Sequence, residues 1–333
     1  MEEGWREDIL GPGFEQRTLR LTPEQDTDDQ TVVATIVRSL PKPRRLWQRR
    51  RQFEDIDVLY VHGWSDYFFQ TRLARFWTSR GARFFALDLR RYGRSLLPGQ
   101  ALNYVADLRA YDEDIESALR VVREEPSGPR RIVLMGHSTG GLVLSLWANR
   151  NPGVASAVVL NSPWLEFQLG AHTRTALAPV AEWRSRRDPL ATAPTIDLGY
   201  YSRAQKEVYD PDDPYTIDEA WRPPNSAPVH AGWVKAILQG HAEVAKGLAI
   251  DVPVLTMLSK KFVAPTKWME ELTRVDSVIV VENIAEAALK LGPSVSIEHI
   301  DGAIHDIFLS RREVRQEAYD RLERWLRGPL PQR

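Results

Sequence analysis

Short, nearly continuous apolar runs alternate with longer stretches of helical periodicity along most of this chain. Seven runs have the length of strands: Thr31–Val37, Asp57–Gly63, Arg83–Asp88, Arg131–Gly136, Ala157–Leu160, Val254–Leu258 and Ser294–Ile300. Apolar runs without polar alternation are typical of strands buried on both faces, as in a parallel sheet that helices cover on both sides. The sequence therefore predicts an α/β fold.

Three segments show the periodicity of helices. Tyr104–Glu124 carries apolar residues at mostly three- and four-residue steps, which predicts an amphipathic helix. Leu142–Asn149 follows a glycine pair and predicts a buried helix, and Val314–Leu326 predicts a last helix with one apolar face.

The alternation of strand-like and helical segments stops in the interval Ser162–Ile250. This interval contains nine prolines and the tryptophans Trp164, Trp183, Trp221 and Trp233. A structureless loop of this length is uncommon in a compact domain. We expect an insertion with short helices of its own that folds over the main domain as a cap. Residues 1–161 and 251–333 would then form the core domain and 162–250 the cap. A second independent domain is the alternative interpretation.

Charge and composition exclude several kinds of partner. Among 333 residues, 44 are Lys or Arg and 45 are Asp or Glu. This balance gives no electrostatic reason to expect a nucleic acid as partner. The basic segment Lys42–Arg51 is interpreted as a solvated connection between two strands. No apolar run approaches membrane-spanning length, and the first residues lack the apolar region of a secretory signal.

The chain contains no cysteine, which excludes disulfides, thiolate nucleophiles and cysteine-ligated metals. Together with the missing signal sequence this predicts a cytoplasmic protein. The histidines form no H-x-x-x-H pair and no phosphate-binding glycine motif occurs, so we expect neither a metal nor a nucleotide cofactor.

The strongest local signal is Gly136–Gly141, with the letters G-H-S-T-G-G, between a predicted strand and a predicted helix. A G-x-S-x-G motif in this context predicts a nucleophilic serine on a sharp turn, here Ser138. Glycines allow the close backbone approach that the turn requires. The backbone N–H of Thr139, at the helix start, is a candidate oxyanion donor. A second candidate is the N–H of Trp64, which follows His62 and Gly63 after an earlier strand.

Four motifs then carry a resemblance, and they are His62–Trp64, Asp88–Ser95, Gly136–Gly141 and Gly302–Asp306. They resemble the α/β-hydrolase superfamily and, more narrowly, its serine aminopeptidase S33 and monoacylglycerol-lipase-like group. The resemblance extends from about residue 30 to 327. It implies an α/β-hydrolase fold with a mostly parallel central sheet, helices on both faces and a helical cap insertion. Arg91 departs from the pattern, since glycine is usual there.

The order of functional residues in this family is serine, acid, histidine. The resemblance therefore implies that His305, in the loop after the last strand, is the general base. Asp276 is the best candidate for the acid that orients it, although 17 residues, Ser259–Val275, separate it from the preceding strand. Glu282 is the alternative. Asp306, beside the base, is expected to hydrogen-bond within its loop.

The leading hypothesis is a serine hydrolase that cleaves a carboxylic ester, either a lipid-like monoester or a lactone, through an acyl-enzyme. The partner would be a small molecule with an apolar acyl or aromatic part, bound by His62, His137, Trp164, Trp183 and Trp233. Three alternatives stay open. An aminopeptidase would use Asp210–Asp213 or Asp218–Glu219 to bind an α-amino group; the others are acyl transfer or cyclisation, and a non-enzymatic receptor. The oligomeric state is left open.

Overall fold

The computed structural model describes residues 4–23, 31–43, 50–125, 128–193 and 197–330. Residues 44–49, the larger part of the basic segment, lie outside this range, so our interpretation of that segment stays a prediction.

One mixed sheet forms the centre of the described chain. Across the sheet its nine strands are β1 (Arg6–Glu7), β2 (Glu15–Leu21), β3 (Val32–Ser39), β5 (Arg83–Asp88), β4 (Ile56–Val61), β6 (Arg131–His137), β7 (Ala157–Asn161), β10 (Val254–Ser259) and β11 (Val295–Ile300). All pairings from β5 to β11 are parallel, and those among β1, β2, β3 and β5 are antiparallel. β4 to β7 and β10 are buried along their whole length, as their apolar sequences predict.

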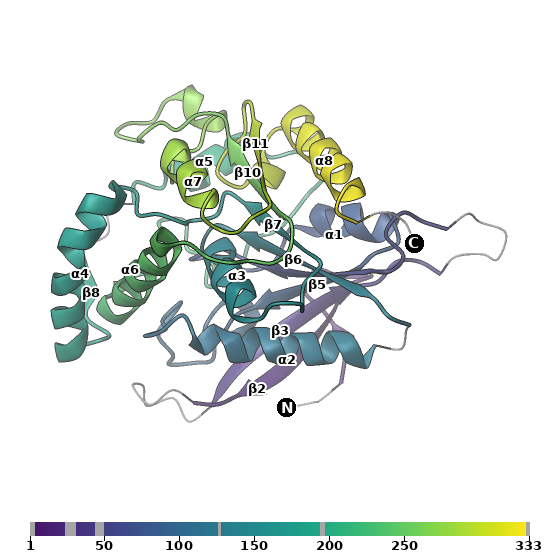
Figure 1. Cartoon of the computed structure of the whole chain (residues 1–333), viewed down its shortest axis with the longest axis horizontal. Helices are drawn as coiled ribbons and strands as arrows, with labels where there is room; N and C mark the ends of the chain where they lie inside the picture. The colour runs from purple at the N-terminus through teal and green to yellow at the C-terminus, as the bar shows by residue number, and fades with distance from the viewer. Residues whose placement is uncertain (1–3, 24–30, 44–49, 126–127, 194–196, 331–333) are drawn as a thin grey trace.

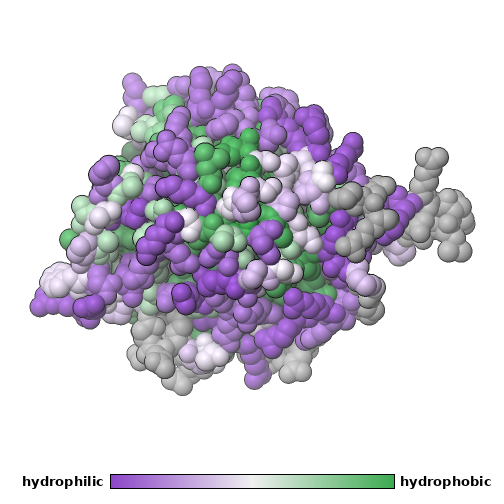
Figure 2. Space-filling model, viewed as in Figure 1, coloured by the Kyte–Doolittle hydropathy of each residue, from purple (hydrophilic) through white to green (hydrophobic). Residues whose placement is uncertain are grey.

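Helices cover both faces of this sheet (Figure 1). One apolar cluster packs α2 (Ala110–Glu124), α3 (Thr139–Arg150), α6 (Ala231–Lys246) and α7 (Val281–Ala288) against one face. A second cluster packs α1 (Thr71–Ser79) and α8 (Arg312–Arg327) against the other. On the side shown in Figure 2, hydrophilic residues cover most of the surface and hydrophobic ones gather near the middle. The architecture is the α/β-hydrolase arrangement that the resemblance implied.

Between β7 and β10 the chain leaves the sheet. This segment contains α4 (Gly170–Arg187), β8 (Thr192–Ala193), α5 (Tyr200–Glu207) and β9 (Val229–His230), followed by α6. β8 and β9 pair with each other and not with the central sheet. Helices α4 and α6 lie side by side at one end of the molecule (Figure 1). Residues 162–250, where the alternation of strand-like and helical segments stops in the sequence, therefore form a mainly helical segment outside the central sheet. We call this segment the helical excursion.

The predicted helix Tyr104–Glu124 is wrong at its start, because α2 begins at Ala110. Tyr104 and Val105 are fully buried without being helical. The Tyr104 ring meets the ring of His230, and its hydroxyl lies close to Gly232 at the start of α6. These residues are therefore apolar because they pack beneath the segment between β7 and β10, and their spacing matches that of a helix only by coincidence.

Candidate active site

The loops that carry the predicted site residues lie together at the carboxyl ends of the parallel strands. The pairings Val61 with Gly136 and His137 with Asn161 bring the ends of β4, β6 and β7 to the same level. The pairing of Ser259 with Ile300 does the same for β10 and β11. Loops after such strand ends are the usual place for sites in open α/β sheets.

Ser138 stands on a strained turn between β6 and α3. Its φ and ψ are 49° and −117°, a conformation that a residue with a Cβ adopts only under constraint from its surroundings. A Cβ at Gly136 would lie 2.7 Å from the carbonyl oxygen of Gly140, and one at Gly140 would lie 2.3 Å from that of His62. Glycine at both positions is therefore a steric requirement of the turn that exposes the Ser138 hydroxyl.

Three buried side chains form a hydrogen-bonded relay behind this turn. His305 Nε2 lies 3.0 Å from Ser138 Oγ, and His305 Nδ1 lies 2.8 Å from Asp276 Oδ2. A carboxylate can only accept, so Nδ1 carries the proton and the lone pair of Nε2 faces the serine. The Asp276 side chain is fully buried, and His305 is 3% exposed. The relay has the atoms needed to take a proton from Ser138.

The long segment between β10 and Asp276 folds back on itself. Phe262 and Asp276 form an isolated parallel bridge, in which the Asp276 N–H donates to Lys261 O and the Val263 N–H donates to Asp276 O. The 17-residue separation therefore leaves Asp276 beside the end of β10. The side chain of Glu282, the alternative acid, is exposed at the start of α7.

The loop after β4 lies against the nucleophile. A Cβ at Gly63 would lie 3.1 Å from Ser138 Cβ, so the chain before Trp64 passes directly beside the serine. Trp64 and Thr139 both line the cavity above Ser138. Within the described chain, neither of their backbone N–H groups donates a hydrogen bond to another protein group. Both residues thus line the cavity beside Ser138 with a backbone N–H that has no protein acceptor in this part of the structure.

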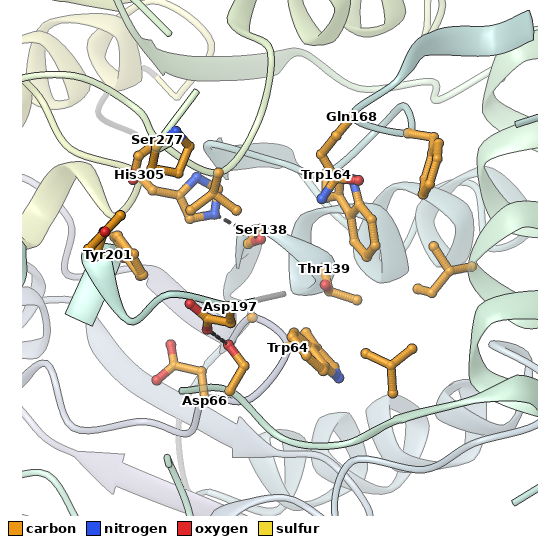
Figure 3. A pocket seen from close by; sticks show the side chains of 18 of the residues that line it. Trp64, Asp66, Ser138, Thr139, Trp164, Gln168, Asp197, Tyr201, Ser277 and His305 are labelled. Atoms are coloured by element: carbon orange, nitrogen blue, oxygen red, sulfur yellow. Dashed lines mark hydrogen bonds between the residues drawn. The ribbon is translucent and has the colours of Figure 1, made fainter. Parts of the chain in front are cut away.

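A cavity of about 870 Å³ opens above Ser138 and His305. Its apolar lining includes a row of three indoles, a phenyl ring and aliphatic side chains: Trp64, Trp164, Phe167, Leu177, Leu198, Val229, Trp233, Val234, Ile237, Leu238 and Val278. The ring centroids of Trp64 and Trp164 lie 5.1 and 5.8 Å from that of Trp233. In Figure 3, Trp64, Thr139 and Trp164 stand on one side of Ser138. An elongated apolar group fits this side.

The opposite side of the cavity is polar. Figure 3 shows Asp66, Asp197 and Tyr201 on that side of Ser138. Arg222 Nε lies 2.8 Å from Asp66 Oδ1, and both side chains are buried. Burial raises the pKa of the Asp66 carboxyl, and the charge of Arg222 opposes that rise. Asp197 accepts hydrogen bonds from Ser226 Oγ and from the Gly199 N–H. Groups that form hydrogen bonds with hydroxyls thus face the relay from this side.

Of the five residues predicted to bind substrate, the structure brings three to the cavity: His137, Trp164 and Trp233. His137 Nδ1 lies 3.2 Å from Asn161 O, and burial lowers its pKa, so the ring stays neutral beside His305. Trp183 is 58% exposed on α4 and does not line the cavity, because it lies on the outer side of that helix.

His62 also lies outside the cavity lining. Its Nε2 accepts from the Leu89 N–H at 3.1 Å, and its Nδ1 lies 2.7 Å from Gly63 O. Burial lowers the pKa of this ring. His62 therefore ties two loops together as a neutral side chain, which explains its place in the His62–Trp64 motif.

The acidic residues considered for an α-amino group are engaged elsewhere. Asp210 pairs with Arg312 and Arg315 on α8, and Asp213 with Arg72 on α1. Asp218 does not line the cavity above Ser138 either. Asp306 accepts from Asn161 Nδ2, Gln70 Nε2 and the Phe308 N–H, so it holds its own loop as expected.

Sequence reasoning missed the polar side of the cavity. Asp66 lies four residues after His62. Its position just after Gly63 and Trp64 could have identified it as a candidate residue of the cavity. Tyr201 and Arg222 carried no such signal, because they come from the proline-rich interval and reach the cavity only through its fold.

No helix among the described residues is both long enough and apolar enough to span a membrane. The same residues contain no group of three or more His, Asp or Glu side chains arranged to hold a metal ion.

The strand order of the sheet and the site at the carboxyl ends of its parallel strands define an α/β-hydrolase fold. The family model described as serine aminopeptidase, S33, matches residues 55–311. The chain belongs to this family.

One curated relative and two solved structures are similar to this chain. A monoacylglycerol lipase of Mycolicibacterium smegmatis is 28% identical over 153 residues, which cover 45% of this chain and 52% of that protein. The chain therefore matches about half the length of this curated relative. A soluble variant of the monoglyceride lipase of Saccharomyces cerevisiae has a similar structure, with a TM-score of 0.63, 16% identity and coverage of 94% and 96% of the two chains. A monoacylglycerol lipase of Paleococcus ferrophilus has a TM-score of 0.61, with 19% identity and coverage of 84% and 96%.

Proposed function

We propose that this hydrolase cleaves carboxylic esters through an acyl-enzyme on Ser138. His305 takes the Ser138 proton as Oγ attacks the ester carbonyl, and it then protonates the departing alcohol. Asp276 fixes the imidazole tautomer and stabilises the imidazolium. The N–H groups of Trp64 and Thr139 bind the oxyanion. The observation that carries this proposal is the relay of 3.0 and 2.8 Å at a strained serine.

We propose a monoester as substrate, with a long apolar acyl chain and a small polar alcohol. The indole row and the aliphatic side chains suit the acyl chain, and the side with Asp66 and Arg222 suits an alcohol with further hydroxyl groups. The similar monoacylglycerol lipases support this substrate class. The helical excursion, residues 162–250, would act as the cap that supplies most of the apolar side.

The cavity gives less support to an aminopeptidase. Such an enzyme needs a carboxylate that is available for an α-ammonium group. Of the two carboxylates on the polar side, Asp66 is paired with Arg222 and Asp197 is bonded to Ser226 and Gly199. An ester hydrolase does not need an available carboxylate of this kind.

A panel of substrates tests the proposal. Nitrophenyl esters and glycerol monoesters of increasing acyl length should be hydrolysed by the native chain and not by Ser138→Ala. The rate should rise with chain length as the acyl group fills the apolar side. Faster cleavage of aminoacyl amides than of any ester would reject ester hydrolysis in favour of peptidase activity.

A further inference from the structure

Four consecutive residues, Trp64–Tyr67, contact four different places in the helical excursion. The indole centroid of the first residue lies 5.1 Å from that of Trp233 on α6. The third residue, Asp66, pairs with Arg222, and the hydroxyl of the fourth, a tyrosine, accepts from the Asp218 N–H at 2.8 Å. The segment that contains the proposed oxyanion amide is therefore bound to the excursion along its length.

The second residue of this segment, Ser65, makes a buried hydrogen bond to the excursion. Ser65 Oγ accepts from the Ala227 N–H at 2.9 Å, and the two residues are 7% and 1% exposed. Within the described chain, the Ala227 N–H donates to no other protein group. A buried backbone N–H that loses its acceptor destabilises the fold, so this bond favours a single position of Ser65 relative to the excursion.

The backbone of Ser65 is strained. Its φ is 53°, in the left-handed region that residues with a Cβ rarely adopt. A glycine adopts such a conformation without steric cost, but it has no hydroxyl. The hydroxyl that bonds to Ala227 is therefore what a serine supplies at this position, and the bond helps to hold the strained conformation.

The peptide unit that joins Gly63 to Trp64 contains the proposed oxyanion donor. His62 Nε2 accepts from the Leu89 N–H, so His62 Nδ1 carries the proton and donates to Gly63 O at 2.7 Å. The peptide bond is trans, so the Trp64 N–H points in the direction opposite to this carbonyl. The core thus fixes the carbonyl side of the peptide unit.

The other side of this peptide unit depends on the residues that follow it. Gly63 has no Cβ, so its own backbone dihedrals restrict the orientation of the Trp64 N–H only weakly. A shift of Ser65 would turn the peptide unit directly beside the nucleophile, since a Cβ at Gly63 would lie 3.1 Å from Ser138 Cβ. A displacement of about 1 Å in a reacting or stabilising group can lower a rate by about 10²-fold.

We propose that Ser65 is a positioning residue through which the helical excursion fixes the oxyanion amide of Trp64. Ser65 is not one of the described residues that line the cavity above Ser138, so it acts through the backbone and not by contact with the substrate. The excursion then contributes to stabilisation of the transition state as well as to the apolar side of the cavity. This inference rests on the proposed ester hydrolysis.

Two substitutions of Ser65 test the proposal. Ser65→Ala removes the hydroxyl and keeps a Cβ at the strained φ, whereas Ser65→Gly removes both the hydroxyl and the strain. Ser202→Ala is the matched control, because Ser202 Oγ donates to Pro224 O at 2.8 Å within the excursion and Ser202 does not line the cavity. Thermal unfolding shows which variants fold.

The substrate is nitrophenyl decanoate, and the inhibitor is a trifluoromethyl ketone with a decyl chain. Ser138 Oγ adds to the carbonyl carbon of this ketone, the carbonyl oxygen becomes an oxyanion, and the serine proton passes to His305. The inhibition constant therefore reports on the oxyanion donors without a later chemical step.

We expect both Ser65 variants to lower kcat about tenfold or more and to keep KM within about twofold of the native value, because the oxyanion forms only after the ester is bound. The inhibition constant of the ketone should rise by a factor similar to the loss in kcat. Ser202→Ala should leave kcat, KM and the inhibition constant unchanged.

A native kcat in a folded Ser65 variant, a change in KM alone, or a lower kcat with unchanged inhibition by the ketone would overturn the role of Ser65. An equal loss in Ser202→Ala would do the same. Unfolding of both Ser65 variants would show a structural role and would likewise overturn the proposal. Ester hydrolysis that persists in Ser138→Ala would instead reject the proposed function.

Discussion

Replacing Asp276 by asparagine tests the relay in the sharpest way, because the structure determines how the new side chain must be oriented. Asp276 Oδ1 accepts two backbone hydrogen bonds, from Val278 at 2.7 Å and from Ile279 at 3.0 Å. An asparagine keeps these bonds only if its oxygen occupies the Oδ1 position. Its NH₂ group then replaces Oδ2 and faces His305 Nδ1.

This orientation reverses the tautomer of His305. An amide NH₂ only donates, so Nδ1 must accept and the proton moves to Nε2. Nε2 then points a proton at Ser138 and can no longer accept one. Loss of the correct tautomer lowers turnover by about 10⁴-fold in enzymes of this mechanism, or about 5.5 kcal/mol of transition-state stabilisation.

The assay is kcat/KM for a nitrophenyl ester, measured with the native chain, Asp276→Asn and Glu282→Gln. Glu282→Gln is the matched control, since it makes the same chemical change in an exposed side chain. Thermal unfolding should show that Asp276→Asn still folds. Near-native activity of Asp276→Asn, or an equal loss in Glu282→Gln, would refute the assignment of Asp276.

Three other changes test the structure around the site. Gly140→Ala should destabilise the fold by about 3 kcal/mol, because its Cβ would meet backbone oxygens 2.3 and 2.4 Å away; thermal unfolding checks this against Gly128→Ala, where nothing lies within 4 Å. Burial lowers the pKa of His241 to about 4, against about 6.5 in an unfolded chain. The unfolded state therefore binds more protons, and stability should fall by about 3 kcal/mol between pH 6.5 and 4, a loss that His241→Phe should reduce in unfolding curves across this range. Arg222→Met should cost about 3–5 kcal/mol by leaving Asp66 buried and unpaired, and the double variant with Asp66→Asn should recover most of it in urea denaturation; equal stability of the two variants would contradict the ion pair.

The parallel part of the sheet was predictable because its strands are buried on both faces. Arg83–Asp88 matches β5 at both ends, and Arg131–Gly136 differs from β6 by one residue. β2, Glu15–Leu21, was missed because its residues are mostly half-buried and polar, as befits a strand near the sheet edge. α1, Thr71–Ser79, was missed although Gly81 follows its C-cap at a φ of 96°, because the residue before its start, Gln70, gives no capping signal.

The relay was predictable to a different degree at each residue. The strained turn at Ser138 imposes glycines that are visible in the sequence. Asp276 is harder, since only the bridge with Phe262 brings it back to the end of β10. The polar side of the cavity was not predictable, because Tyr201 and Arg222 depend on how a long helical excursion packs over the sheet.

The central claim is that Ser138 is a nucleophile activated by His305. The most direct measurement is the mass of the intact protein after reaction with a serine-directed fluorophosphonate, followed by peptide mapping. The account predicts a single adduct on Ser138 in the native chain, none in Ser138→Ala, and strongly slowed labelling in His305→Ala. A native chain that stays unlabelled, or an adduct on a different residue, would contradict it.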